Sequence, residues 1–121
     1  MYNIRFFKDK NGKRPIVDYL RELEAKQDKD SRIKLGKIYD CIDYLRSAGH
    51  KAKEPYAKHL SGDIWELRPL RDRILYAAWD DNCFILLHHF VKKTQKTPPR
   101  ELKKAKRNLA DIRERGIDNE R

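Results

Sequence analysis

Residues 64–91 read IWELRPLRDRILYAAWDDNCFILLHHFV, and this stretch decides the fold. It contains three runs rich in apolar and aromatic side chains, at residues 64–70, 73–79 and 84–91, separated by short polar segments. Such spacing predicts three antiparallel strands connected as a meander. The last run is apolar on both sides, which is typical of a central strand.

The segments on either side of this meander predict one further strand and three helices. Residues 2–7 alternate as a strand, and residues 15–26 carry apolar side chains at helical spacing after a proline that suits the first turn. A second helix is expected from about residue 31 until Gly49, a suitable C-cap. A third helix follows the Pro98-Pro99 pair, and its apolar stripe comprises Leu102, Ala105, Leu109 and Ile112.

Together these elements predict one α+β domain over residues 1–116, in the order β-α-α-β-β-β-α, with residues 117–121 as a frayed tail. The N-terminal strand is expected to join the meander in a small, antiparallel-rich sheet. We expect the helices to pack on one face of this sheet and to leave the other face partly open.

The chain is strongly basic, with 29 Lys and Arg residues against 19 Asp and Glu, a formal net charge of +10. Residues 92–115 alone contain ten basic and three acidic side chains, so most of the excess lies in one stretch. Localised positive charge favours a polyanionic partner such as nucleic acid, the ribosome, an anionic membrane or an acidic protein. The alternative is a basic surface with no partner.

Several classes of protein are disfavoured by the same sequence. Cys41 and Cys83 are the only cysteines and belong to no CxxC or CxxH pattern, so we expect buried thiols, no metal site and no cofactor. The N-terminal MYNIRFFKDK lacks the apolar core of a signal peptide, and no apolar run is long enough to cross a membrane. These features predict a cytoplasmic protein without membrane contact.

A cluster of arginines at the first turn of the meander is the first candidate site. Arg68, Arg71 and Arg73 fall within six positions, and the planar guanidinium group makes bidentate contacts with phosphate. On a strand, Arg68 is expected to point away from Trp65 and onto the open face of the sheet. The alternative is that these arginines only form surface ion pairs with Glu66 or with Asp72.

The end of the last strand, HHFVKK, is the second candidate site. His88 and His89 are expected to face opposite sides of the sheet, and a histidine can exchange a proton near neutral pH. Lys92 and Lys93 can do the same if neighbouring cations lower their pKa. For each histidine alone, the alternative is a structural residue of the sheet.

RNA cleavage requires little more than these groups. The 2′-hydroxyl of RNA attacks the adjacent phosphate, a base takes its proton, an acid protonates the leaving 5′-oxygen, and cations stabilise the phosphoryl charge. A sheet that carries Arg68, Arg73, His88, Lys92 and Lys93 permits this reaction without a metal.

Several motifs, taken in order, resemble one protein family. KHLSG at 58–62, WELR at 65–68, RILY at 73–76 and FVKKTQKTP at 90–98 are similar to the phage-derived, HigB-like branch of the RelE/ParE toxin superfamily. The last of these motifs is distinctive, and the others gain specificity from their order. The resemblance extends to the helix after Pro99, and the order of elements suits the whole chain.

This resemblance implies a RelE-like fold and a toxin of a type II toxin–antitoxin system. The implied activity is that of a metal-independent mRNA interferase, an endoribonuclease that cleaves mRNA on the ribosome. The implied partner is a HigA-type antitoxin with a helix-turn-helix domain, through which the complex would bind operator DNA. Two alternatives stay open: a ParE-like toxin that binds DNA gyrase without cutting RNA, and a basic module that only binds nucleic acid or a protein.

The resemblance also suggests which residues act. Arg68 and Arg73 match basic positions at the cleavage site of RelE-like toxins, and His88, Lys92 and Lys93 lie where the last strand delivers catalytic groups. No tyrosine follows Tyr76, so the C-terminal tyrosine that some RelE toxins use has no counterpart. Further basic residues are expected to hold RNA electrostatically, namely Lys58, Lys96, Lys103, Lys104 and Arg107.

Overall fold

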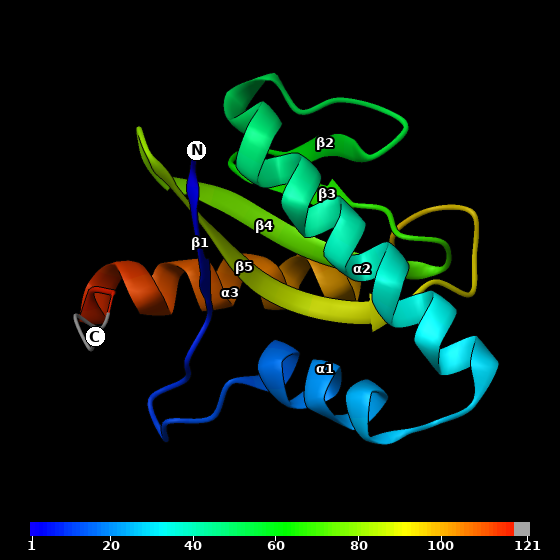
Figure 1. Ribbon diagram of the computed structural model, residues 1–121. Coiled ribbons are helices and arrows are strands. Elements are labelled where there is room, and N and C mark those ends of the chain that lie inside the picture. The colour runs from blue at the N-terminus through cyan, green and yellow to red at the C-terminus, as the bar shows by residue number, and fades with distance from the viewer. Residues whose placement is uncertain (118–121) are drawn as a thin grey trace.

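The computed structural model describes residues 1–117 and shows one five-stranded sheet with helices on both faces (Figure 1). The elements in chain order are β1 (Asn3–Phe6), α1 (Pro15–Ala25), α2 (Lys29–Ala48), a 3-10 turn (Gly49–Lys51), β2 (Ala57–Ser61), β3 (Ile64–Leu67), β4 (Asp72–Asp80), β5 (Cys83–Val91) and α3 (Pro99–Arg115). The strands lie in the order β1-β5-β4-β3-β2. β1 runs parallel to β5, and the other neighbouring pairs are antiparallel.

The meander of β3, β4 and β5 confirms the main prediction from the sequence, but the sheet contains one more strand than expected. β2 pairs with β3 at the edge of the sheet, so the order is β-α-α-β-β-β-β-α. Its sequence, AKHLS, contains one large apolar residue, and most of its side chains are exposed or half-buried. An edge strand with so little apolar alternation carries no clear strand signal.

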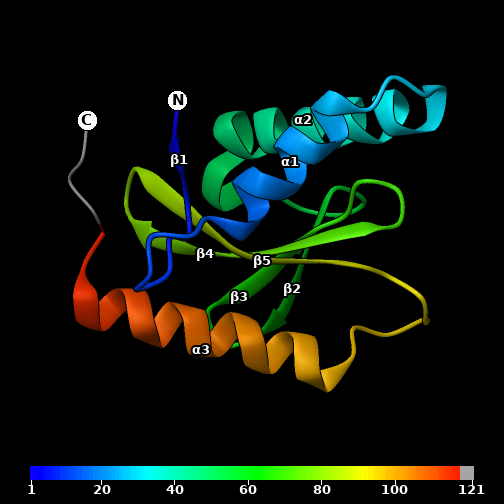
Figure 2. The same cartoon turned by 90° about the horizontal axis from the view of Figure 1, so that it is seen from below.

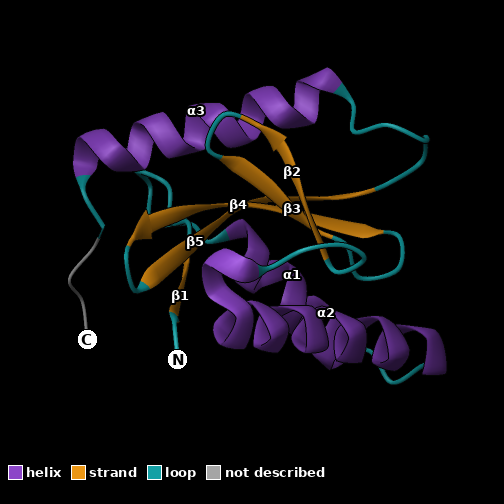
Figure 3. Ribbon diagram, turned by 90° about the horizontal axis from the view of Figure 1, so that it is seen from above, coloured by secondary structure: helices purple, strands orange, loops and turns teal. Residues whose placement is uncertain are grey.

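The expectation that all helices pack on one face was wrong. α1 and α2 cover one face of the sheet, and α3 lies across the opposite face (Figures 2 and 3). The reason is that β4 and β5 are apolar on both sides, so each face needs a cover. A single layer of helices would have left Leu75, Ile85 and Leu87 in water.

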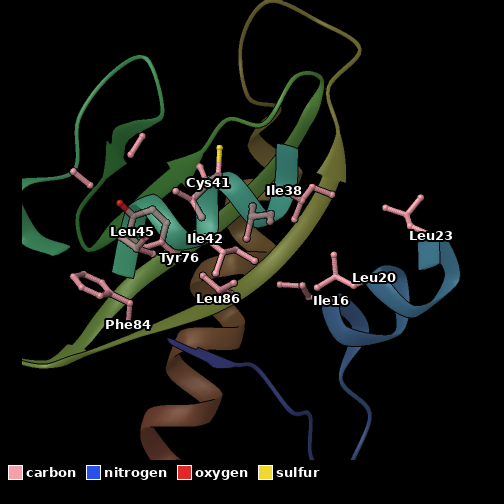
Figure 4. Close-up of a cluster of buried hydrophobic side chains, with 14 residues drawn as sticks. Ile16, Leu20, Leu23, Ile38, Cys41, Ile42, Leu45, Tyr76, Phe84 and Leu86 are labelled. Carbon is pink, nitrogen blue, oxygen red and sulfur yellow. The ribbon is translucent and has the colours of Figure 1, made fainter. Parts of the chain in front are cut away.

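Two hydrophobic clusters therefore share the sheet. The first fills the space between α1, α2 and the sheet (Figure 4), and its largest members include Ile16, Leu20, Ile38, Ile42, Leu45, Tyr76, Phe84 and Leu86. The second lies under α3 and includes Leu75, Ile85, Leu87, Phe90, Ala105, Leu109 and Ile112. Apolar burial on both faces holds all three helices to the same strands.

A bulge in β5 sets the direction of the two histidines. Leu75 pairs with His88 whereas Tyr76 pairs with Leu86, so Leu87 is an extra residue in β5. Leu87 and His88 consequently both face α3, and His89 faces α1. The histidines do lie on opposite faces, but the bulge decides which histidine takes which face.

The helix ends follow the sequence closely. Asp28 caps α2 by accepting a hydrogen bond of 2.9 Å from the Ser31 backbone N–H. Gly49 ends α2 with φ of 56°, and a Cβ atom there would collide with the Tyr2 ring.

No helix within residues 1–117 is both long and apolar enough to span a membrane. Apart from Ile117, the tail expected to fray lies outside the described residues.

Candidate functional site

Two loops meet at one end of the sheet. The β3–β4 turn, residues 68–71, contacts the first residues of the loop 92–98, which leads into α3. The Lys92 backbone N–H donates to the Arg71 carbonyl oxygen at 2.7 Å, and Arg71 Nη2 donates to the Lys92 carbonyl oxygen at 3.2 Å. These reciprocal hydrogen bonds fix the arginine turn against the lysines of the second loop.

Between the two loops lies an open hollow of about 470 Å³, which we term the cationic hollow. Its lining comprises Leu70, Arg71, Arg73, Lys92, Lys93, Thr94 and Gln95. Four of these seven residues are cationic, and none of the described residues that line it is acidic. A concave surface lined by one sign of charge concentrates counter-ions, so this hollow suits an anion such as phosphate.

Arg73 forms the inner wall of the cationic hollow. It is only 7% exposed, and its Nη1 donates to the carbonyl oxygens of Leu70 at 2.7 Å and Asp72 at 2.8 Å. Its Nε is buried and has no hydrogen-bond partner among the described residues. Burial lowers the pKa of the guanidinium and the nearby Glu66 carboxylate opposes that effect, but arginine remains charged in proteins. Arg73 therefore shapes the turn and keeps one buried N–H group unsatisfied.

Glu66 lies behind the arginines and is 3% exposed. Its Oε1 is 3.6 Å from Arg68 Nε and 3.8 Å from Arg73 Nε, while its Oε2 accepts a hydrogen bond of 2.6 Å from Thr97 Oγ1. The sequence predicted Glu66 only as a surface ion-pair partner, yet it is a buried carboxylate that links both arginines to the second loop. Because side chains alternate along β3, Glu66 and Trp65 lie on opposite faces of the sheet. Nothing in the sequence showed that α3 would cover the face on which Glu66 lies.

The ammonium group of Lys92 has a lowered pKa at this end of the sheet. Loss of hydration lowers its pKa, and the positive charges of Arg73, Arg68 and Lys58 lower it further against the opposing effect of Glu66. Lys58 lies opposite Glu66 in the β2–β3 register. The fold thus brings five of the candidates near one another: Lys58, Arg68, Arg73, Lys92 and Lys93.

His88 does not line the cationic hollow. It lies under the start of α3, where its Nε2 is 2.7 Å from Glu101 Oε1 and its side chain is 17% exposed. Burial lowers the pKa of His88, the Glu101 carboxylate opposes this effect, and the net result is a pKa below the ordinary value. The side chain therefore connects β5 to α3 rather than facing the lysines of the loop.

Apart from Lys58 in β2, the basic residues expected to hold RNA lie along α3 and the loop before it. Lys96, Lys103, Lys104 and Arg107 are all exposed. Lys104 is near enough to His88 to help lower its pKa. Arg107, in contrast, lines a separate hollow with Phe7 and the β1–α1 loop, toward the other end of the sheet.

A second polar cluster was missed by sequence reasoning. Asp72 is fully buried, and its Oδ1 accepts a hydrogen bond of 2.9 Å from the Tyr19 hydroxyl and lies 2.9 Å from His89 Nε2. Lys34 Nζ is 3.6 Å from the same oxygen. The His89 ring stacks on Tyr19 with centroids 3.9 Å apart. These residues are far apart in sequence, so only the tertiary fold reveals the cluster.

Among the described residues, neither the cysteines nor the acidic side chains form a metal site. Cys41 and Cys83 are buried free thiols, and burial raises the pKa of both. The described residues contain no group of three or more His, Cys, Asp or Glu side chains placed to hold a metal ion.

Fold and site together define a small, basic α+β protein with a cationic hollow at one end of its sheet. The chain belongs to the family described as phage derived protein Gp49-like (DUF891), whose model matches residues 18–110. This is a RelE/HigB-like toxin family, so the resemblance is confirmed at the level of the family. Membership is consistent with a toxin of a toxin–antitoxin system and implies an antitoxin partner. No curated protein matches the chain.

Proposed function

We propose that the protein has a RelE-like fold and is the toxin of a type II toxin–antitoxin system that cleaves mRNA on the ribosome without a metal. The observation that carries this proposal is the cationic hollow, in which Arg71, Arg73, Lys92 and Lys93 surround one opening with no described acidic side chain in its lining. A phosphate of the RNA backbone is the ligand that best matches such a lining.

The proposed reaction follows from the chemistry of RNA. A general base takes the proton of the 2′-hydroxyl, the 2′-oxygen attacks the adjacent phosphorus, and the bond to the 5′-oxygen breaks. The products are a 2′,3′-cyclic phosphate and, once the leaving oxygen is protonated, a 5′-hydroxyl. Arg73, with Arg68 beside it, would stabilise the charge that develops on the phosphoryl oxygens. Lys92 would protonate the leaving 5′-oxygen, because a lowered pKa makes its ammonium a better proton donor. His88 lies outside the hollow, which favours Lys92 over His88 for this role.

The experiment that tests this function is primer extension on cellular mRNA after a short pulse of expression. New 5′ ends inside translated regions, absent when translation is blocked, are expected. Lys92→Ala should reduce cleavage by about 100-fold or more, the usual contribution of a general acid. Lys10→Ala is the matched control, since Lys10 lies in the β1–α1 loop at the other end of the sheet (Figures 1 and 2).

The arginines need a more careful test. Arg68→Ala and Arg73→Ala should both abolish toxicity, but Arg73 also bonds two backbone carbonyls and its loss will disturb the turn. Circular dichroism of each variant must therefore accompany the toxicity assay. Growth arrest without mRNA cuts in the unmodified protein would overturn the nuclease assignment and favour a ParE-like action on gyrase.

The proposed partner is a HigA-type antitoxin with a helix-turn-helix domain, which would carry the complex to operator DNA. Its support is the toxin family to which the chain belongs. Co-expression of an adjacent helix-turn-helix gene should restore growth and yield a complex on purification. The ribosome as target places this proposed activity in the cytoplasm.

A further inference from the structure

A second hollow of about 480 Å³ adjoins the cationic hollow across the β3–β4 turn. We term it the tyrosine hollow, and its lining comprises Lys37, Asp40, Cys41, Tyr44, Tyr56, Arg68, Pro69 and Leu70. Leu70 lines both hollows, so only the width of the turn separates them. A ligand held in one hollow can therefore extend into the other.

An aromatic pair forms the wall of the tyrosine hollow. The rings of Tyr44 and Tyr56 have centroids 4.8 Å apart and an interplanar angle of 46°. The Tyr44 hydroxyl accepts a hydrogen bond of 3.0 Å from the Lys53 backbone N–H, which fixes that ring. Tyr56 is 51% exposed, so its side chain is open to a ligand from the solvent. Exposed aromatic rings are the usual platforms on which unpaired bases stack.

Tyr56 is also fixed relative to the arginine of the turn. The Arg68 backbone N–H donates to the Tyr56 carbonyl oxygen at 3.0 Å. The Arg68 guanidinium, in turn, lies 3.6 Å from Glu66, the carboxylate that also faces Arg73. One chain of contacts thus connects the aromatic wall to the wall of the cationic hollow.

The charges of the tyrosine hollow differ from those of its neighbour. Lys37 and Arg68 are positive, but the exposed Asp40 adds a carboxylate to a lining that is otherwise largely apolar. A carboxylate disfavours a phosphate and offers an acceptor to the amino group of a base. The cationic hollow has the opposite preference, since no described acidic residue lines it.

From this juxtaposition we propose that the tyrosine hollow binds an unstacked nucleobase of single-stranded RNA, next to a phosphate held in the cationic hollow. The proposal deepens the function proposed above and rests on it for the identity of the polyanion. Stacking on Tyr56 gives affinity for a base of any kind, and Asp40 favours a base that carries an exocyclic amino group.

The test compares two labelled RNAs by fluorescence anisotropy with the full chain. One is a penta-adenylate, and the other is its abasic counterpart, which keeps every phosphate and lacks every base. Tyr56→Ala should weaken binding of the penta-adenylate about tenfold and leave binding of the abasic RNA within about twofold. Tyr56→Trp should retain binding, because tryptophan also stacks. Tyr39→Ala is the matched control: Tyr39 is 39% exposed on α2 and hydrogen-bonds Glu24 of α1.

Each other result decides against the proposal. Equal losses of affinity for the two RNAs would show that Tyr56 acts on the RNA phosphates or on the protein fold. No loss of affinity for either RNA would show that no base stacks on Tyr56. Absence of RNA binding by the unmodified chain would also overturn it. If Tyr56→Ala spares RNA and instead weakens the antitoxin complex, the hollow belongs to a protein interface.

Failure of the base subsite and failure of the nuclease assignment give different results. Base-dependent binding through Tyr56 without mRNA cuts in cells would keep the subsite and remove the nuclease. Unchanged cuts and unchanged binding in Tyr56→Ala would keep the nuclease and remove the subsite.

Discussion

At the scale of single residues, two buried carboxylates organise the basic end of the sheet. Glu66 faces α3 and is 3% exposed, whereas Asp72 faces α1 and α2 and is fully buried. Arg73 lies directly after Asp72 in the chain and contacts Glu66. A buried carboxylate is stable only if it is paired and hydrogen-bonded, so each one requires cationic or donor groups at a fixed place. The two carboxylates therefore help to fix the loops that form the cationic hollow.

The Asp72 cluster gives a direct test of buried against exposed hydrogen bonds. Tyr19→Phe removes a 2.9 Å bond to Asp72, and Tyr39→Phe removes a 2.9 Å bond to the exposed Glu24. We expect Tyr19→Phe to lower the free energy of unfolding by about 2 kcal/mol, because a charged group is the acceptor and Asp72 cannot turn to water instead. Tyr39→Phe should change it by less than about 0.5 kcal/mol. Urea denaturation measures both, and equal losses would contradict a stabilising role for the cluster.

The lysines of the second loop predict a defined salt dependence. Removal of one lysine that neutralises a phosphate reduces the slope of log affinity against log salt by about 0.7 for single-stranded nucleic acid. Lys93→Ala should produce this change in RNA binding, since Lys93 lines the cationic hollow and is exposed. Lys10→Ala, far from the hollow, should leave the slope unchanged. The same change in slope for both variants would mean that RNA binds without a preferred site.

At the scale of elements, the sequence predicted those strands and helices whose apolar pattern is strong. α1, α2, α3 and the meander have clear periodicity and end at turn or capping residues such as Gly49. β2 lacks such a pattern, because it pairs with a single neighbouring strand at the edge of the sheet. The bulge at Leu87 was also unpredictable, since it depends on the register between two strands and not on either strand alone.

Of the candidate site, the sequence predicted only the residues that neighbouring strands bring together. Arg73 pairs with Phe90 in the register of β4 and β5, and Lys92 and Lys93 come directly after β5. The meander alone therefore brings these three side chains to the same hollow. His88 was expected beside them, but it lies under α3 because that helix covers the face where the bulge directs it. Glu66 and the Asp72 cluster depend on contacts between distant segments, which no local pattern reveals.

The contact between β5 and α3 predicts a pH dependence of stability. Burial lowers the pKa of His88 in the folded protein below its ordinary value of about 6.5, so the unfolded chain binds the proton more readily. Its contribution to stability is therefore present above pH 6.5 and is lost as the pH falls toward the folded-state pKa. His88→Gln keeps a donor for Glu101 and removes this titration. Between pH 7 and pH 5, the free energy of unfolding of the unmodified protein should fall by up to about 1.4 kcal/mol per pH unit more than that of the variant. Parallel profiles in chemical denaturation would contradict this account.

At the scale of the whole molecule, one sheet serves two hydrophobic clusters. Leu75 and Tyr76 are neighbours in β4, yet they belong to different clusters on opposite faces. Loss of either cluster exposes one face of the same strands, so the two layers of helices depend on one shared sheet. The function proposed here depends on this arrangement, because the cationic hollow lies where β4, β5 and the loop leading into α3 meet.

The two tryptophans allow this dependence to be measured. Trp65 packs against the first cluster and Trp79 against the second, and the chain contains no other tryptophan. In Trp65→Phe and Trp79→Phe, each remaining tryptophan reports on one face, and we expect the same urea midpoint by fluorescence in both. Leu109→Ala, in the cluster under α3, should lower stability by about 2–5 kcal/mol and shift both reporters equally. If only the Trp79 signal shifted, α3 would unfold separately and residues 1–116 would not form one cooperative domain.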